Sequence, residues 1–214
     1  MAGYKAHMAT GILLGGIATV GAVIAMAVDI ILSPFIFIAV VIGSFLPDID
    51  SDTGIPVRIL FSVLGFLTLL IVLYILRDNF GDNYLKSVLL LLVAYGFVDI
   101  ILRKIFNKFT KHRGVFHSLL AVAMSMLSLN IILLKAGLFY FDAATITVAL
   151  GVGYLGHLLL DELNSVVNLS GIPFIPNKSL GSALKFGSKS LRVNIIAIVI
   201  VVILLTLTSF HFDT

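Results

Sequence analysis

Long apolar segments constrain this chain of 214 residues more than any other feature. Hydropathy distinguishes seven of them, at residues 8–28, 30–46, 57–76, 86–106, 115–134, 143–163 and 191–210. A helix needs about 20 mostly apolar residues, within a range of about 17–25, to cross the hydrocarbon core of a bilayer. Backbone groups inside lipid must be hydrogen-bonded internally, which only helices and closed barrels achieve. The sequence therefore predicts an all-α, polytopic transmembrane helix bundle of about seven spans.

Composition agrees with a chain whose solvent is the lipid bilayer. Hydrophobic residues make up 60% of it and charged residues 12%, whereas soluble domains average about 45–50% and about 25%. We find no polar block long enough to be a soluble domain, so residues 1–214 are predicted to form a single integral membrane domain. The absence of cysteine excludes disulfides and thiolate metal sites.

The first two apolar segments need separate interpretation. Residues 8–28 continue well beyond the apolar core of a signal peptide, which favours an uncleaved first helix. Gly11 and Gly15 form a G-x-x-x-G pair there, which permits close helix approach, although glycine is also ordinary in membrane helices. Residues 30–46 are short and follow closely, so they are interpreted as either a tilted span or a re-entrant arm.

Lysine and arginine are distributed unequally between the two membrane faces. Seven spans place four polar stretches on the face of the N-terminus: residues 1–7, 47–56, 107–114 and 164–190. Eleven of the 14 basic residues lie on or near that face. The positive-inside rule makes that face cytoplasmic. We therefore predict a multi-pass protein of the cytoplasmic membrane with its N-terminus inside and 164–190 as a cytoplasmic loop.

Side chains suited to metal binding gather on this same face from four separate parts of the chain. They are His7, Asp48, Asp50, His112, His117, His157 and Asp161. The topology was assigned from hydropathy and not from the histidines, so their coincidence at one depth is informative. Ionisable groups at membrane depth are costly and indicate function. The fifth histidine, His211, lies near the other face and receives no role.

His157 and Asp161 are four residues apart on an expected helix. This spacing puts both side chains on one helix face. Such a pair binds one metal ion, or the carboxylate orients the imidazole from outside the coordination sphere. The alternative is a hydrogen-bonded polar pair at a contact between helices.

Asp48 and Asp50 follow Pro47 at the end of the second segment. We expect an extended loop there, because proline favours an exit from the helix. Alternate residues of an extended chain point to the same side, so the two carboxylates would clasp one cation or bridge two. A solvated acidic loop is an equally simple interpretation.

His112, Arg113 and His117 flank the start of the fifth segment. Imidazoles suit zinc, manganese or iron, and a guanidinium holds an oxyanion in a bidentate manner. An ordinary basic helix flank is the alternative, but it leaves two histidines unexplained. His7, at the mouth of the first segment, is a candidate for a further ligand.

Together these motifs resemble the YdjM-like family of predicted membrane-bound metal-dependent hydrolases. The resemblance covers nearly the whole chain, in order: His7, Leu46-Pro47-Asp48-Ile49-Asp50, His112-Arg113-Gly114-x-x-His117 and Gly153-Tyr154-x-x-His157-x-x-x-Asp161. The family is distantly similar to zinc-dependent phospholipase C and P1-type nucleases, which are all-helical phosphodiesterases. The resemblance implies divalent metal ions, zinc or alternatively manganese, and a phosphate contact from Arg113. The implied metal ligands are His7, Asp48, Asp50, His112, His117, His157 and Asp161.

Two functions are compatible with these residues. The first is a metal-dependent hydrolase of a phosphoester or phospholipid-like amphiphile at the cytoplasmic surface, with Asp48 or Asp50 as base and Arg113 stabilising phosphoryl charge. The second is a divalent-cation transporter or channel, although transporters usually bind near the bilayer midplane. A non-catalytic membrane protein is a third possibility. No basic and aromatic platform indicates nucleic acid.

Overall fold

The computed structural model describes residues 3–50, 54–76, 84–109, 114–166, 184–188 and 190–209. The elements in these ranges are all helical: α1 (Tyr4–Ile24), α2 (Ser33–Gly43), η1 (Leu46–Asp50), α3 (Ile55–Leu76), α4 (Tyr84–Gly96), η2 (Phe97–Leu102), α5 (Arg103–Phe109), α6 (Leu119–Lys135), α7 (Tyr140–Val166) and α8 (Leu191–Ser209). Because α4, η2 and α5 follow one another without a break, the described residues form seven continuous helices besides the short η1. The prediction of an all-α membrane bundle with about seven segments is confirmed.

Five of the described helices are long and apolar enough to cross a membrane. They are α1, α3, the continuous run Tyr84–Lys108, α7 over Tyr140–Asn164, and α8. The other two apolar helices, α2 and α6, are shorter. The 11 residues of α2 rise only about 17 Å, against a hydrocarbon core of about 30 Å. The helix α2 is therefore too short to span by itself.

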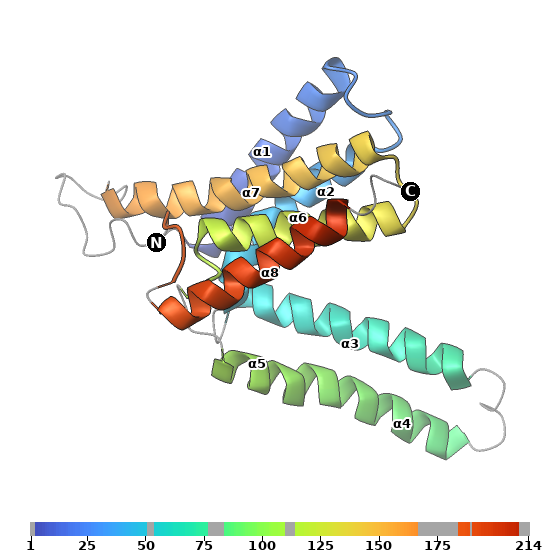
Figure 1. Ribbon diagram of the computed structural model, residues 1–214. Helices are drawn as coiled ribbons and strands as arrows, with labels where there is room; N and C mark the ends of the chain where they lie inside the picture. The colour runs from blue at the N-terminus through green and yellow to red at the C-terminus, as the bar shows by residue number, and fades with distance from the viewer. Residues whose placement is uncertain are drawn as a thin grey trace. The chain divides into compact units, whose positions relative to one another are not determined.

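The helices belong to two compact units, each described by itself (Figure 1). The first unit, Met1–Pro47 with Arg113–Thr214, contains α1, α2, α6, α7 and α8. The second unit, Asp48–His112, contains α3, α4, η2 and α5. That residues 1–214 form one membrane domain stays a prediction.

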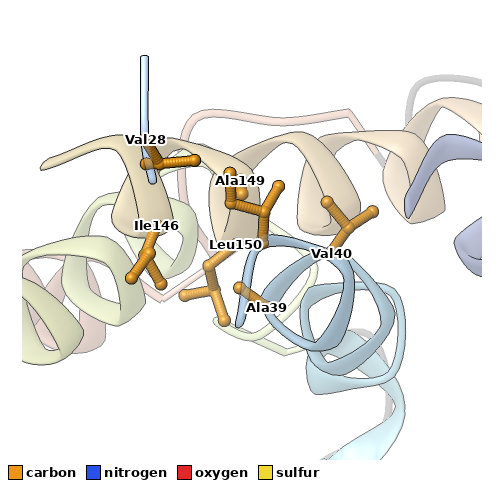
Figure 2. Packing of buried hydrophobic residues seen from close by; sticks show 7 residues of the cluster. Val28, Ala39, Val40, Ile146, Ala149 and Leu150 are labelled. Carbon is orange, nitrogen blue, oxygen red and sulfur yellow. The ribbon is translucent and has the colours of Figure 1, made fainter. Parts of the chain in front are cut away.

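Helix α7 is the centre of the first unit, where it packs against α1, α2 and α6, while α6 also packs against α8. Figure 2 shows apolar side chains of α2 and α7 meeting there, with Val28 from the connection after α1. The buried members are Val28, Ile36, Ala39, Val40, Ile146, Ala149 and Leu150. This cluster fixes α2 against α7, the helix that carries two of the predicted ligands.

Glycines bring the backbones of the first unit unusually close together. A Cβ at Gly153 of α7 would lie 2.0 Å from the Val40 carbonyl oxygen of α2, and a Cβ at Gly43 would lie 2.2 Å from the Leu150 carbonyl oxygen. The two helices are thus in backbone contact, as small residues allow in membrane proteins. Gly11 and Gly15 are buried as well, and they face α2 closely enough that a Cβ would meet Ser44 and Phe37. The predicted close approach at this G-x-x-x-G pair is confirmed.

The second unit is a pair of helices with α3 against the run from α4 through η2. Its buried residues are Val57, Phe61 and Val98. The segment η2 is a π-helix. Its Asp99 Oδ1 lies 3.4 Å from Nη1 of Arg103, four residues later. This ion pair at i, i+4 partly neutralises two charges on an otherwise apolar helix.

The segment Leu46–Asp50 forms a 3₁₀-helix, so the prediction of an extended loop was wrong. Pro47 lies in the first turn of this helix, where its fixed φ is compatible with helical geometry and its missing N–H costs nothing. A 3₁₀-helix has about three residues per turn, whereas side chains of an extended chain alternate with a period of two. The alternation argument for a shared cation therefore does not apply to Asp48 and Asp50.

The polar connection expected at 164–190 begins later than expected, because α7 continues to Val166. Residues 167–183 and 189 lie outside the described part of the chain. The described segment 184–188 passes the start of α6, where the carbonyl oxygens of Lys185 and Phe186 accept hydrogen bonds from the N–H groups of Leu119 and Leu120 at 2.9 and 3.2 Å. It thereby satisfies amides that a helix N-terminus leaves without internal partners.

Candidate metal centre

Four of the predicted ligands meet inside the first unit. His7, His117, His157 and Asp161 are each at most 1% exposed, and we call them the His/Asp cluster. They come from α1, the segment before α6, and α7, which are distant in sequence. Lone histidines and aspartates are rarely buried to this degree unless they are paired or bind a metal.

The local structure holds each histidine in place. His7 is the fourth residue of α1, on the face that carries the buried Gly11 and Gly15. His117 directly precedes Ser118, the N-cap of α6, whose hydroxyl accepts a hydrogen bond from the Ala121 N–H. N-capping by serine sets where a helix begins. The backbone of His117 is therefore positioned at the start of α6.

His157 is oriented by the backbone of α2. Its Nδ1 lies 2.8 Å from the Ser44 carbonyl oxygen. A carbonyl oxygen only accepts, so Nδ1 carries the hydrogen and donates it. In this tautomer Nε2 carries the lone pair, as in metal-binding histidines whose other nitrogen donates to a carbonyl. Ser44 is the C-cap of α2, so the α2–α7 contact directly sets the direction of this imidazole.

The Asp161 carboxylate is the centre of the cluster. Its Oδ1 lies 3.2 Å from His7 Nε2. Its Oδ2 lies 3.7 Å from His117 Nε2 and 3.9 Å from His157 Nε2. The last two distances are too long for hydrogen bonds, and they slightly exceed the separation of about 3.3 Å between two ligand atoms of a tetrahedral zinc ion. The i, i+4 pair of α7 thus faces one shared space.

The imidazoles also contact one another. The rings of His7 and His157 are stacked, with centroids 3.6 Å apart and planes inclined by 11°. The ring of His117 meets that of His157 edge-on, at a centroid distance of 5.6 Å. Three imidazoles packed this closely would repel one another if protonated. Neutral imidazole is the form that binds metal.

The cluster has the ligand atoms that a divalent metal needs. One atom from each of His117, His157 and Asp161 forms a set within 4.8 Å of one another. In addition, His7 Nδ1 is buried with no hydrogen-bond partner among the described residues. Imidazole nitrogen and carboxylate oxygen are the ligand types of zinc and manganese sites. These residues therefore fit a metal ion.

The other predicted site residues are placed as follows. Asp48 lies in η1 as the first residue of the second unit, and its role as a ligand stays a prediction. Asp50 ends η1, but its side chain lies outside the described part. His112 and Arg113 are also outside it. Their roles as metal ligand and phosphate contact stay predictions.

Two supporting residues were missed by sequence reasoning. Ser44 acts through its carbonyl oxygen, which any residue has, so no sequence signal indicates it. Tyr154 is 1% exposed, and its hydroxyl donates to the Phe116 carbonyl oxygen at 2.6 Å, next to His117. A tyrosine inside an apolar helix, three residues before a histidine, was the available signal, because buried tyrosine hydroxyls usually have a partner.

Tyr154→Phe is expected to lower the free energy of unfolding by about 1 kcal/mol, because the Phe116 carbonyl oxygen loses its donor in a buried place. Thermal unfolding of the purified protein in detergent measures this change. Tyr95→Phe is the matched control, since Tyr95 packs through its ring against Gly65 and keeps that ring. Equal stability of the two variants would contradict a structural role for the Tyr154 hydroxyl.

Comparison with known protein families identifies the family of the chain. The family model described as YdjM inner membrane protein matches residues 1–212. The chain belongs to the YdjM family. The resemblance to the YdjM-like family is confirmed, while the hydrolase similarity that it implied stays a prediction. A multi-pass inner-membrane protein follows from the family together with five helices able to cross a bilayer. Neither the curated proteins nor the solved structures give a match.

Proposed function

We propose that this YdjM family member is a membrane-bound metal-dependent hydrolase that cleaves a phosphoester in a phospholipid-like amphiphile. One observation carries the proposal: three histidines, from distant parts of an apolar chain, are buried together around the carboxylate of Asp161. Burying four ionisable groups in a membrane protein is costly. A bound metal ion compensates for that cost and explains why these residue types meet.

The ligand set favours catalysis over a purely structural metal. His117, His157 and Asp161 supply two nitrogens and one carboxylate oxygen, which is the kind of set that leaves one coordination position open in catalytic zinc sites. Zinc is the best match, and manganese also accepts these ligands. When bound, such an ion supplies Lewis acidity and activates water for attack at neutral pH.

The protein residues orient this chemistry. The Ser44 carbonyl oxygen holds the His157 ring in one tautomer. His7 approaches Asp161 Oδ1, which leaves Oδ2 directed toward the space between His117 and His157. The low exposure of these side chains keeps bulk water away, which strengthens electrostatic interactions within the cluster. Arg113 is proposed to stabilise the phosphoryl oxygens.

The depth of the cluster along α7 is relevant to the choice between hydrolysis and transport. Asp161 and His157 lie three and seven residues before the end of the apolar span Tyr140–Asn164, or about 5 and 11 Å along the helix axis. The midplane of the hydrocarbon core is about 15 Å from its edge. Asp161 is thus nearer to a membrane surface, whereas His157 is nearer to the midplane, where transporters bind. By the distribution of lysine and arginine, we propose that this surface is cytoplasmic.

Turnover in proteoliposomes tests the function. The protein is reconstituted in phosphatidylcholine vesicles and loaded with zinc or manganese, and the release of water-soluble phosphorylated headgroup is measured. We expect metal-dependent release that EDTA and the variant His157→Ala both abolish, and that His211→Ala leaves unchanged. Absence of release from metal-loaded protein, with zinc instead accumulating inside the vesicles, would replace hydrolysis by transport.

A further inference from the structure

The segment 184–188, which we call the strap, is a feature of the first unit that the proposed function does not use. It precedes α8 and lies outside the helices. Two of its residues are large, apolar and exposed: Leu184 is 42% exposed and Phe186 66%. Exposed apolar side chains are ordinary within a membrane span, where they face lipid. The strap is a connection between helices, so what its apolar side chains face needs a separate explanation.

Hydrogen bonds of its backbone attach the strap to α6, α7 and α8. Two of its carbonyl oxygens accept hydrogen bonds from the first amides of α6. The Leu184 N–H donates to Glu162 Oε2 of α7 at 3.4 Å. The Asn194 side chain of α8 accepts from the Ser188 N–H at 2.6 Å and donates to the Ser188 carbonyl oxygen at 2.9 Å. The strap thus joins the starts of α6 and α8 to the end of α7, which lie at one end of the unit (Figure 1).

These contacts place the strap at the depth of the outermost turns of two membrane spans. Glu162 lies two residues before the end of the span Tyr140–Asn164, and Asn194 lies three residues after the start of the span Leu191–Ser209. These positions are about 3 and 5 Å inside the two spans along their helix axes. The polar headgroup layer extends about 5–8 Å beyond the hydrocarbon core on each side. The strap is therefore at the boundary between headgroups and acyl chains, and not in bulk water.

We propose that the strap is a membrane-surface anchor, whose Leu184 and Phe186 side chains insert between the phospholipid headgroups of the leaflet in which α7 ends. Aromatic and aliphatic side chains beside polar groups favour this boundary. Backbone groups close to lipid need hydrogen-bond partners, and the three helices supply several of them. Arg192 is exposed in the first turn of α8, where lipid phosphates attract its guanidinium. This inference does not depend on the proposed hydrolase function.

The anchor also supports the end of the unit that carries the His/Asp cluster. The strap binds the amide of Leu119, two residues after His117. It also binds the side chain of Glu162, which directly follows Asp161 in α7. Lipid that holds the strap in place therefore helps to hold the first turn of α6. Removal of the Phe186 ring should loosen that turn without altering any residue of the cluster.

A tryptophan reporter tests this proposal, because the chain contains no tryptophan. Phe186→Trp is reconstituted in phosphatidylcholine vesicles whose acyl chains carry bromine either close to the headgroup or close to the chain end. Val202→Trp is the control on α8, since Val202 is 52% exposed and lies 11 residues after the start of the span, or about 17 Å along the helix axis. We expect bromine close to the headgroup to quench Phe186→Trp more strongly, and bromine close to the chain end to quench Val202→Trp more strongly.

Aqueous iodide provides the opposite measurement. It should quench Phe186→Trp far less than it quenches N-acetyltryptophanamide in solution. Iodide quenching as strong as that of the free compound, without quenching by brominated lipid, would place the strap in water and overturn the proposal. Protection from both quenchers would also overturn it, because protein such as a second copy of the chain would then cover the strap. Leu184→Trp repeats the measurement if Phe186→Trp is not recovered from the membrane.

Hydrogen exchange tests the support of α6. In Phe186→Ser, the amides of Leu119 and Leu120 should exchange about tenfold faster in vesicles than in the unaltered protein, because the strap that binds them loses its larger anchor. Phe139→Ser is the matched control, since Phe139 is 83% exposed and directly precedes α7, at the opposite end of the unit. It should leave the exchange of these two amides unchanged. Equal exchange in the two variants would refute the support of α6 by the anchor.

Discussion

Asp161→Asn is expected to lower the metal affinity of the purified protein by more than about 100-fold, since replacing residues that merely support a metal ligand already costs about 10–100-fold. Asp161 is the one residue of the His/Asp cluster that approaches all three imidazoles. Asparagine keeps the shape of the side chain but loses the negative charge, and its amide nitrogen has no lone pair for a metal. Metal content by elemental analysis, and zinc titration of the stripped protein, measure the change.

The matched control for this prediction is Asp142→Asn. It makes the same chemical change on the same helix, in the first turn of α7 and far from the cluster. We expect it to retain the metal content of the unaltered protein. Asp161→Asn should still be recovered from the membrane as a folded protein, because its volume is unchanged. Unchanged zinc affinity in a folded Asp161→Asn protein would exclude Asp161 as a ligand and remove the basis of the proposed hydrolase.

Gly153→Ala is expected to lower the free energy of unfolding by about 3 kcal/mol or more, the upper range for overpacking in a protein interior. The added methyl group would lie 2.0 Å from the Val40 carbonyl oxygen and 2.8 Å from the Val40 carbonyl carbon. Both atoms belong to the backbone, which cannot rotate away as a side chain does. The helices α2 and α7 would have to separate, and the Ser44 carbonyl oxygen would move away from His157.

Thermal unfolding in detergent checks this prediction, with zinc affinity as a second measurement. Gly43→Ala should behave alike, because its methyl group would meet the Leu150 carbonyl oxygen at 2.2 Å. Gly16→Ala on α1 is the matched control, since a Cβ there meets nothing within 4 Å. It should be neutral or stabilising, because alanine favours helix over glycine by about 1 kcal/mol. If Gly153→Ala were as stable as Gly16→Ala, the backbone contact between α2 and α7 would be refuted.

Much of the site was predictable because its residues lie near the ends of apolar segments. Hydropathy indicates where a segment leaves the bilayer, so His7, His117 and the pair His157 and Asp161 were expected at one depth before any contact was known. The spacing of the pair on α7 follows from the helical repeat alone. The depth of a residue in the membrane and the helix face on which it lies both follow from its position along the chain. A single sequence is therefore enough to predict them.

The structure revealed the features of the site that depend on contacts between segments. The tautomer of His157 depends on a backbone carbonyl oxygen of α2, which no residue type reveals. Which histidine approaches which Asp161 oxygen depends on how α1 and α6 pack beside α7. The helical form of Leu46–Asp50 was mispredicted, because proline is compatible both with the exit from one helix and with the first turn of the next.

By itself the sequence determined that the chain lies in a membrane as a series of helices, and that its histidines and carboxylates gather toward one surface. These conclusions follow from the free-energy cost of placing polar groups in lipid. That cost applies to each segment independently of its neighbours. Only the tertiary structure decided that α2 is too short to cross alone, that it contacts α7 through glycine, and that three buried histidines surround the Asp161 carboxylate. Lipid tails are as apolar as the helix surfaces, so no hydrophobic effect drives apolar helices together inside the bilayer. Which helices pair therefore depends on shape and close packing, which hydropathy does not encode.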